Sequence, residues 1–264
     1  MMSCAKPKSS EKVRTSNFFT TKNGTKKSEA FFVFVVVKKA ADTANARRSS
    51  VADLRFTTYN SGGLNHTEAS MGINLVTTDY VRSYLAKLDA LLKTVDPKQV
   101  ARVGELLTAA RAEGRQVFLV GNGGSAALAS HMAVDLGKGC SRNRDKRFRV
   151  LSLTDNVPWM TALSNDISYD DVFVEQLKNY AEKGDLVIAI SGSGNSKNVL
   201  KAVQYANTVG CATVGISGFA GGKLKEMVTD HVHVKADHMG LIEDVQLIVG
   251  HILVYGFMDT EGCG

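Results

Sequence analysis

The chain has 264 residues, enough for one large domain or two small ones, and 44% of them are hydrophobic, which is ordinary for a globular protein with a buried core. Its formal net charge of +6 is concentrated near the N-terminus, since residues 1–50 contain 11 Lys and Arg against 3 Asp and Glu, and the remainder contains 21 against 23. This near-neutral remainder argues against a nucleic-acid-binding core, and the four cysteines form no C-x-x-C pair, so we expect a cytoplasmic protein with reduced thiols rather than a zinc finger or a disulfide framework.

The first 70 residues differ from the rest, because they are rich in Lys, Ser, Thr and Asn and show no sustained hydrophobic period. Their one apolar run, residues 31–37, is far shorter than the roughly 20 residues of a membrane-spanning helix. Lys38 and Lys39 follow it where a signal peptide would have small residues, so no membrane association is expected; an organellar transit peptide is the alternative. We predict that residues 1–70 are a disordered or non-native basic extension, that the domain occupies residues 71–264, and that Met71 could be the true start.

A helical hydrophobic period predicts two helices, 75–93 and 97–113, before any strand. Asp96 and Pro97 are typical of a helix start, and Gly114 of a helix end. Strands are then predicted at 116–120, 149–153, 185–190, 211–216 and 231–234, and helices at 125–138, 156–163, 170–181, 196–209, 222–228 and 240–258. This alternation predicts an α/β fold, a three-layer α/β/α sandwich around a five-stranded parallel sheet, with an N-terminal helical extension.

Two loops rich in glycine and serine each follow a predicted strand and precede a helix. The first is Gly121-Asn122-Gly123-Gly124-Ser125, and the second runs from Ser191 to Ser196. Glycines let the backbone approach a ligand closely, and successive N–H groups together with the positive end of a helix dipole attract an anion. Since ligands bind at the carboxyl ends of parallel strands, the two loops predict a phosphate site, although each loop alone could be only a tight connection.

The order of the motifs resembles that of the bacterial phosphoheptose isomerases, which belong to the SIS (sugar isomerase) superfamily. The residues that carry the resemblance are the loop 121–125, His131-x-x-x-Asp135, Ser164-Asn165-Asp166, the loop 191–196, and Gln246 with His251-Ile252-Leu253. The resemblance covers about residues 72–260, and residues 1–70 have no counterpart in that family.

The resemblance implies a role for each matching residue. Asp135 would be the proton-abstracting base and His251 the general acid/base, and a zinc ion would be held by His131, Asp135, Glu243 and His251. The implied contacts to the phosphorylated sugar come from both loops, the Asn-Asp pair and the last helix: Asn122, Gly123, Gly124, Ser125, Asn165, Asp166, Ser191, Gly192, Ser193, Ser196 and Glu243. The chain departs from the family pattern in having Asp135 for the usual Glu and Glu243 for the usual Gln, and some relatives carry Thr in place of Gly192.

The spacing of these residues supports part of the implied metal site. His131 and Asp135 are four residues apart, so they share one helix face and can bind one ion. Glu243 and His251 are eight residues apart, which on a straight helix is a rise of roughly 12 Å, too far for one ion. Either the helix bends or a neighbouring subunit supplies one residue, and the resemblance implies a homotetramer with sites at subunit interfaces.

The leading hypothesis is an aldose–ketose isomerase that interconverts sedoheptulose 7-phosphate and D-glycero-D-manno-heptose 7-phosphate through an enediol, for heptose precursor biosynthesis. Two alternatives share the fold: a non-catalytic SIS module that binds a protein partner such as a replication initiator, and a sensor that binds a sugar phosphate. Asp135 favours the module, because a carboxylate that is about 1.5 Å shorter than that of Glu can slow proton abstraction. His131 and His251 favour the isomerase.

We expect a protein that begins at Met71 to fold, assemble and function like the full chain. Residues 1–70 have too few periodic apolar positions to offset the entropy of ordering them. Melting temperature and oligomer mass, measured for both proteins, test this expectation. A large fall in melting temperature on truncation would show that residues 1–70 belong to the domain.

Overall fold

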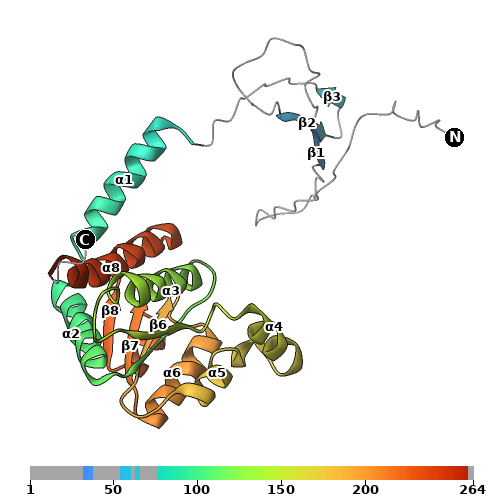
Figure 1. Cartoon of the computed structure of the whole chain (residues 1–264). Helices are drawn as coiled ribbons and strands as arrows, with labels where there is room; N and C mark the ends of the chain where they lie inside the picture. Colours follow the sequence, from blue (N-terminus) through green and yellow to red (C-terminus); the bar gives the residue numbers. More distant parts are fainter. Residues whose placement is uncertain (1–31, 38–53, 61–62, 66–75, 261–264) are drawn as a thin grey trace, which may run out of the picture. The chain divides into compact units, whose positions relative to one another are not determined.

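The computed structural model describes residues 32–37, 54–60, 63–65 and 76–260. The chain divides into two units, Met1–Val81 and Arg82–Gly264. In the first unit, β1 (Phe32–Val37), β2 (Leu54–Asn60) and β3 (Gly63–Asn65) form an antiparallel sheet (Figure 1). No strand is predicted there from the sequence. The proposal that residues 1–70 are an extension stays a prediction, and Met71 lies outside the described residues.

The second unit is built on a parallel sheet with the strand order β5-β4-β6-β7-β8, which confirms the predicted five-stranded sheet. The strands are β4 (Gln116–Val120), β5 (Arg149–Ser152), β6 (Leu186–Ser191), β7 (Ala212–Ser217) and β8 (Asp230–His233). From β4 the chain adds β5 on one side and then returns to add β6 on the other. Strand order therefore reverses between β4 and β6, and the crevice at such a reversal is where open α/β sheets bind ligands.

Helices cover both faces of this sheet, as the alternation of side chains along each strand requires (Figure 1). In β4, Val117 and Leu119 belong to the core shared with α2, α3 and α8, while Phe118 and Val120 belong to the core shared with α5 and α6. Strand β6 is buried at all six positions. A strand that is apolar on both faces is stable only between two helical layers, so these runs specify the three-layer sandwich.

The helices agree with the predicted ranges at most positions. They are α1 (Thr78–Leu92), α2 (Pro97–Glu113), α3 (Gly124–Val134), α4 (Val157–Asp166), α5 (Val174–Tyr180), α6 (Lys197–Val209), α7 (Leu224–Met227) and α8 (Met239–Thr260). Asp96 and Gly114 cap α2 as predicted: the Asp96 carboxylate accepts from the Lys98 N–H, and Gly114 is left-handed with φ of 67°.

Two predicted helices are each divided in the structure. The predicted helix 125–138 continues from α3 into a π-helical turn, η1 (Asp135–Gly139), in which the Cys140 N–H donates to the Asp135 carbonyl. The predicted helix 170–181 begins as a 3₁₀ turn, η2 (Tyr169–Asp171), before α5. Hydrophobic spacing does not distinguish these tighter and wider turns from an α-helix.

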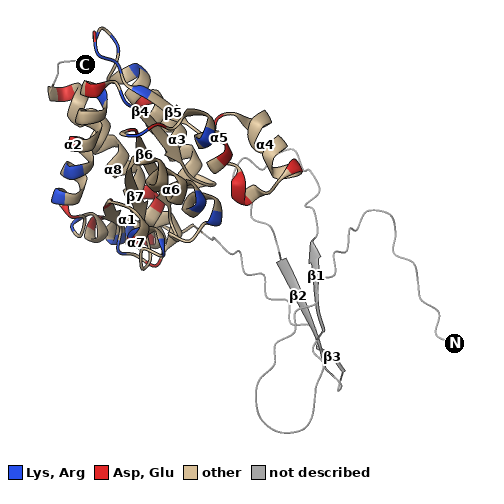
Figure 2. Cartoon of the chain, turned by 90° about the horizontal axis from the view of Figure 1, so that it is seen from below, with Lys and Arg blue, Asp and Glu red and all other residues tan. Residues whose placement is uncertain are grey.

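Helix α8 has the length and apolar composition of a membrane-spanning helix, but 50% of the relevant stretch is buried inside the protein. Leu241, Ile242, Val245, Val249 and Leu253 belong to the core. This is the pattern of a core helix. Figure 2 shows both basic and acidic residues on the helices of the second unit, so the charged residues in this view are not of one sign.

We expect Gly194→Ala to destabilise the protein more than Gly114→Ala, although both glycines are left-handed, with φ of +65° and +67°. A Cβ at Gly194 would lie 2.0 Å from the Gly221 carbonyl oxygen, whereas a Cβ at Gly114 meets nothing within 4 Å. The strained backbone alone costs about 1 kcal/mol of unfolding free energy in either variant, and the clash adds about 1–3 kcal/mol at Gly194. Urea unfolding of both variants tests this, and equal losses would show that the chain around Gly221 moves aside without cost.

Candidate functional site

The two glycine- and serine-rich loops lie at the carboxyl ends of adjacent strands, because β4 pairs directly with β6. In the first loop Gly123 has φ of 55° and ψ of −122° and caps α3. A Cβ at Gly121 would lie 2.6 Å from the Ser125 carbonyl oxygen, so this position also requires glycine. Ser125 is 5% exposed. The loop therefore brings its backbone and the N-terminus of α3 to the ligand side of the sheet.

The second loop joins β6 to α6 and has its own internal hydrogen bonds. The Ser191 hydroxyl accepts from the Gly194 N–H and lies 3.3 Å from the Ser196 hydroxyl, and Ser193 accepts from the Asn195 N–H. One hydroxyl of the Ser191–Ser196 pair donates to the other, so two of the three serines keep an O–H hydrogen available to a ligand. The structure thus brings together the predicted residues Ser191, Ser193 and Ser196 as one group of donors.

A neighbouring segment, residues 218–224, holds this second loop in place. The Gly218 N–H donates to the Gly192 carbonyl at 2.9 Å, and the Leu224 N–H donates to the Gly194 carbonyl at 3.0 Å. The Lys223 N–H donates to the Asn195 side chain at 3.1 Å. On the other side, a Cβ at Gly192 would lie 2.6 Å from the sulfur of Met239. Gly192 therefore leaves room for Met239, whose side chain would have to move to admit a larger residue at this position.

Three predicted catalytic and metal-binding residues meet in one cluster, which we call the acid–base triad: His131 of α3, Asp135 at the start of η1, and His251 of α8. The Nε2 atoms of His131 and His251 are 2.8 Å apart, and His131 Nε2 is 3.3 Å from Asp135 Oδ2. One ligand atom from each residue lies within 4.8 Å of the other two. The His131 and Asp135 side chains are 46% and 24% exposed, so the triad is open to solvent.

The fourth predicted ligand, Glu243, lies apart from the triad. A Cβ at Gly124 would lie 2.5 Å from the Glu243 carboxylate, which places that carboxylate against the first turn of α3. Seven residues of α3 and eight of α8 separate this contact from the triad, a rise of roughly 10–12 Å. Within one chain Glu243 therefore lies beside the first loop, and its role as a metal ligand stays a prediction.

The predicted pair Asn165 and Asp166 ends α4, and the Asn165 amide donates to the Asp166 carboxylate at 2.8 Å. Both residues are exposed. Their contact to substrate stays a prediction.

Two residues that hold Asn122 were not predicted from the sequence. Asn198, 2% exposed in the first turn of α6, exchanges two amide hydrogen bonds of 2.9 Å with Asn122. Tyr169 of η2 donates its hydroxyl hydrogen to the Asn122 Oδ1 at 2.8 Å. Asn198 could have been noticed in the sequence, because it is a polar residue on the buried face of α6, which is otherwise apolar. No comparable sequence pattern indicates Tyr169.

His231 lies near the second loop without adding charge to it. Its Nε2 is 2.8 Å from the hydroxyl of Ser217, which pairs with Ser191 across the strands. Burial, with His233 and Lys225 nearby, lowers the pKa of His231 to about 4. The imidazole is therefore neutral at pH 7 and brings no positive charge to this loop.

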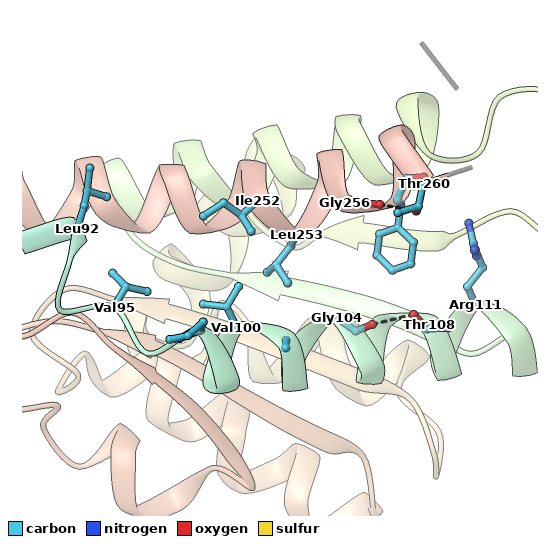
Figure 3. A pocket seen from close by; sticks show the side chains of 13 residues that line it. Leu92, Val95, Val100, Gly104, Thr108, Arg111, Ile252, Leu253, Gly256 and Thr260 are labelled. Atoms are coloured by element: carbon cyan, nitrogen blue, oxygen red, sulfur yellow. Dashed lines mark hydrogen bonds between the residues drawn. The ribbon is translucent and has the colours of Figure 1, made fainter. Parts of the chain in front are cut away.

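A cavity of about 610 Å³ lies between α2 and α8 (Figure 3). Its hydroxyls bond to their own helices, Thr108 to the Gly104 carbonyl and Thr260 to the Gly256 carbonyl. The Arg111 guanidinium lies over the rings of Phe148 and Phe257. None of the predicted site residues lines this largely apolar cavity, so it is not the phosphate site.

Comparison with known proteins identifies relatives of this fold. The family model for the SIS domain matches residues 79–218. The phosphoheptose isomerase of Aliarcobacter butzleri is 33% identical over 175 residues, which cover 66% of this chain and 92% of the relative. The phosphoheptose isomerase of Rhodospirillum rubrum is 35% identical over 164 residues, which cover 62% of this chain and 86% of the relative. Solved phosphoheptose isomerases from Neisseria gonorrhoeae and Francisella tularensis share the fold, with TM-scores of 0.63 and 0.64 and 24% and 23% identity. Each solved match covers 69% of this chain and 98% of the other.

We expect zinc affinity, measured by calorimetry, to fall at least about 100-fold in His131→Ala and in His251→Ala, because each removes one of three clustered donors. Glu243→Ala is the comparison, and we expect it to keep zinc affinity within about threefold, since this carboxylate lies beside Gly124. An equal loss in Glu243→Ala would make Glu243 a ligand. Unchanged affinity in both histidine variants would exclude the triad as the metal site.

Proposed function

The chain belongs to the SIS domain family and resembles its phosphoheptose isomerases, and on this basis we propose that it interconverts sedoheptulose 7-phosphate and D-glycero-D-manno-heptose 7-phosphate. The observation that carries the proposal is the acid–base triad. Its 2.8 Å contact between His131 and His251 joins α3 to α8, and its 3.3 Å contact joins His131 to Asp135 one turn later. Helix α3 follows the first loop, and the first turns of α8 lie against both loops. A module that only binds sugar phosphates needs the loops but not the triad. The curated relatives are isomerases by name, so the alternative of a non-catalytic module is not favoured.

Aldose–ketose isomerisation moves a proton between neighbouring carbons and a second proton between their oxygens. Asp135 is the proposed base, since a carboxylate can accept the carbon-bound proton, and His251 is the proposed acid/base for the oxygens. The two side chains meet around His131 Nε2, so both can reach one enediol. The serines of the second loop and the backbone of the first would hold the phosphate and keep the sugar in register.

The donor set of the triad fits a zinc ion. Two imidazoles and one carboxylate, with the fourth position left open, form a common ligand set of catalytic zinc. Nitrogen ligands on a tetrahedral zinc are separated by roughly 3.3 Å, close to the contacts of 2.8 and 3.3 Å. Such an ion would stabilise the negative charge of an enediolate. His131, Asp135 and His251 are the residues that would hold it.

We propose that the active form is a homotetramer in the cytoplasm, with the sites at subunit interfaces. Large apolar side chains on α1 and α8 support this assembly: Leu85, Ile252 and Tyr255 are 59%, 54% and 50% exposed. The product would serve heptose precursor biosynthesis.

Incubation of the protein with sedoheptulose 7-phosphate and zinc should give the aldose product, detected by chromatography. Asp135→Asn should abolish turnover, because an amide cannot accept the proton. Asp135→Glu should keep or raise turnover. Asp89→Asn, which removes an exposed carboxylate paired with Lys93 on α1, is the control and should be silent. Lack of turnover in both the wild type and Asp135→Glu, with zinc still bound, would contradict the isomerase and favour a binding module.

A further inference from the structure

We propose that Tyr169 and Asn198 are positioning residues that fix the side chain of Asn122 so that it offers the bound sugar phosphate one N–H donor and no acceptor. The inference rests on the proposed function, in which Asn122 contacts the sugar phosphate. Its evidence is a closed set of hydrogen bonds among three elements that are distant in sequence: the loop after β4, the 3₁₀ turn η2, and the first turn of α6.

One backbone group determines the direction of every bond in this set. The Val199 N–H can only donate, and it donates to Asn198 at 2.9 Å, so the accepting atom is the amide oxygen Oδ1. The other end of the Asn198 amide is then Nδ2, which donates to Asn122 at 2.9 Å. The Asn122 atom that accepts is therefore its Oδ1, and its Nδ2 donates back to Asn198 Oδ1.

The direction of the tyrosine bond follows from the same argument. Tyr169 Oη lies 2.8 Å from the Asn122 Oδ1, which can only accept, so the Tyr169 hydroxyl donates. Both acceptor sites of that oxygen are now used, one by Asn198 and one by Tyr169. Of the two hydrogens on the Asn122 Nδ2, one is given to Asn198 and one remains. Asn122 can therefore bind only an acceptor, such as a hydroxyl, carbonyl or phosphate oxygen of the ligand.

Tyr169 can act as a fixed point because η2 is anchored to the body of the domain. Lys201 of α6 holds Asp171 at 2.8 Å, Lys197 lies 3.7 Å from Asp170, and the next residues, Val172 and Phe173, are fully buried. Tyr169 itself is 52% exposed. The helix before it, α4, has no buried residue and projects from the sandwich (Figure 1). The tyrosine thus connects a firmly packed turn to the ligand side of the first loop.

Tyr169→Phe removes only the hydroxyl, and Tyr180→Phe, at a tyrosine of similar exposure (48%), is the matched control. We expect Tyr169→Phe to raise the KM for sedoheptulose 7-phosphate about 3- to 10-fold, since Asn122 loses one restraint, and to leave kcat within about twofold. Tyr180→Phe should change neither. Calorimetric Kd values for sedoheptulose 7-phosphate with each variant measure the same effect without turnover.

An Asn122→Ala background distinguishes positioning from a direct contact or a general loss of structure. If Tyr169 acts through Asn122, Tyr169→Phe adds no further loss of affinity in Asn122→Ala. An equal loss in both backgrounds, or no loss in either, would overturn the proposal.

If the wild type does not bind sedoheptulose 7-phosphate at all, the proposed function fails. Crystal structures of ligand-free wild type and Tyr169→Phe then test the positioning role by itself. An Asn122 amide that keeps one orientation in both overturns the positioning role, and one that turns or becomes mobile in Tyr169→Phe supports it.

Discussion

Helices α3 and α8 run parallel and approach each other at Gly250, where an added Cβ would lie 3.0 Å from Leu128 and 3.3 Å from Met132. A larger residue there would require the Leu128 and Met132 side chains to shift. Their close approach places Glu243 against Gly124 near the helix starts and His251 against His131 two turns later. The chemistry of the proposed site therefore depends on the close packing of this helix pair, in which a glycine faces the partner helix.

The two loops depend on a different constraint, the reversal of strand order between β4 and β6. Parallel strands that are paired in register end at the same edge, so loops 70 residues apart in sequence become neighbours. The polypeptide then closes this edge with α8, whose first turns carry Met239 beside Gly192 and Glu243 beside Gly124. One helix thus contacts both loops and, further along, the triad.

Much of this arrangement could be predicted from the sequence because it rests on local rules. Apolar runs such as Leu186–Ile190 predict strands buried on both faces, and a spacing of four residues predicts that His131 and Asp135 share a helix face. The same rule could not predict that Asp135 begins a π-helical turn. The wider turn starts only at this residue, so the hydrophobic spacing before it is that of an ordinary α-helix. Nor could the rule predict the bonds that join Tyr169, Asn122 and Asn198, because these depend on how three distant segments pack.

Asp135 shows how a shorter side chain can still complete the triad. Its backbone has φ of −69° and ψ of −43°, which is ordinary α-helix, so the π-turn that follows has not moved its Cα toward the ligands. The 3.3 Å contact with His131 is instead made because the imidazole, one turn earlier on the same helix, reaches along the helix surface to the carboxylate. The carboxylate consequently stays close to α3, about 1.5 Å short of where a glutamate would end. A sugar whose carbon-bound proton is to be taken by Asp135 must then approach the C-terminal end of α3 more closely by about that distance.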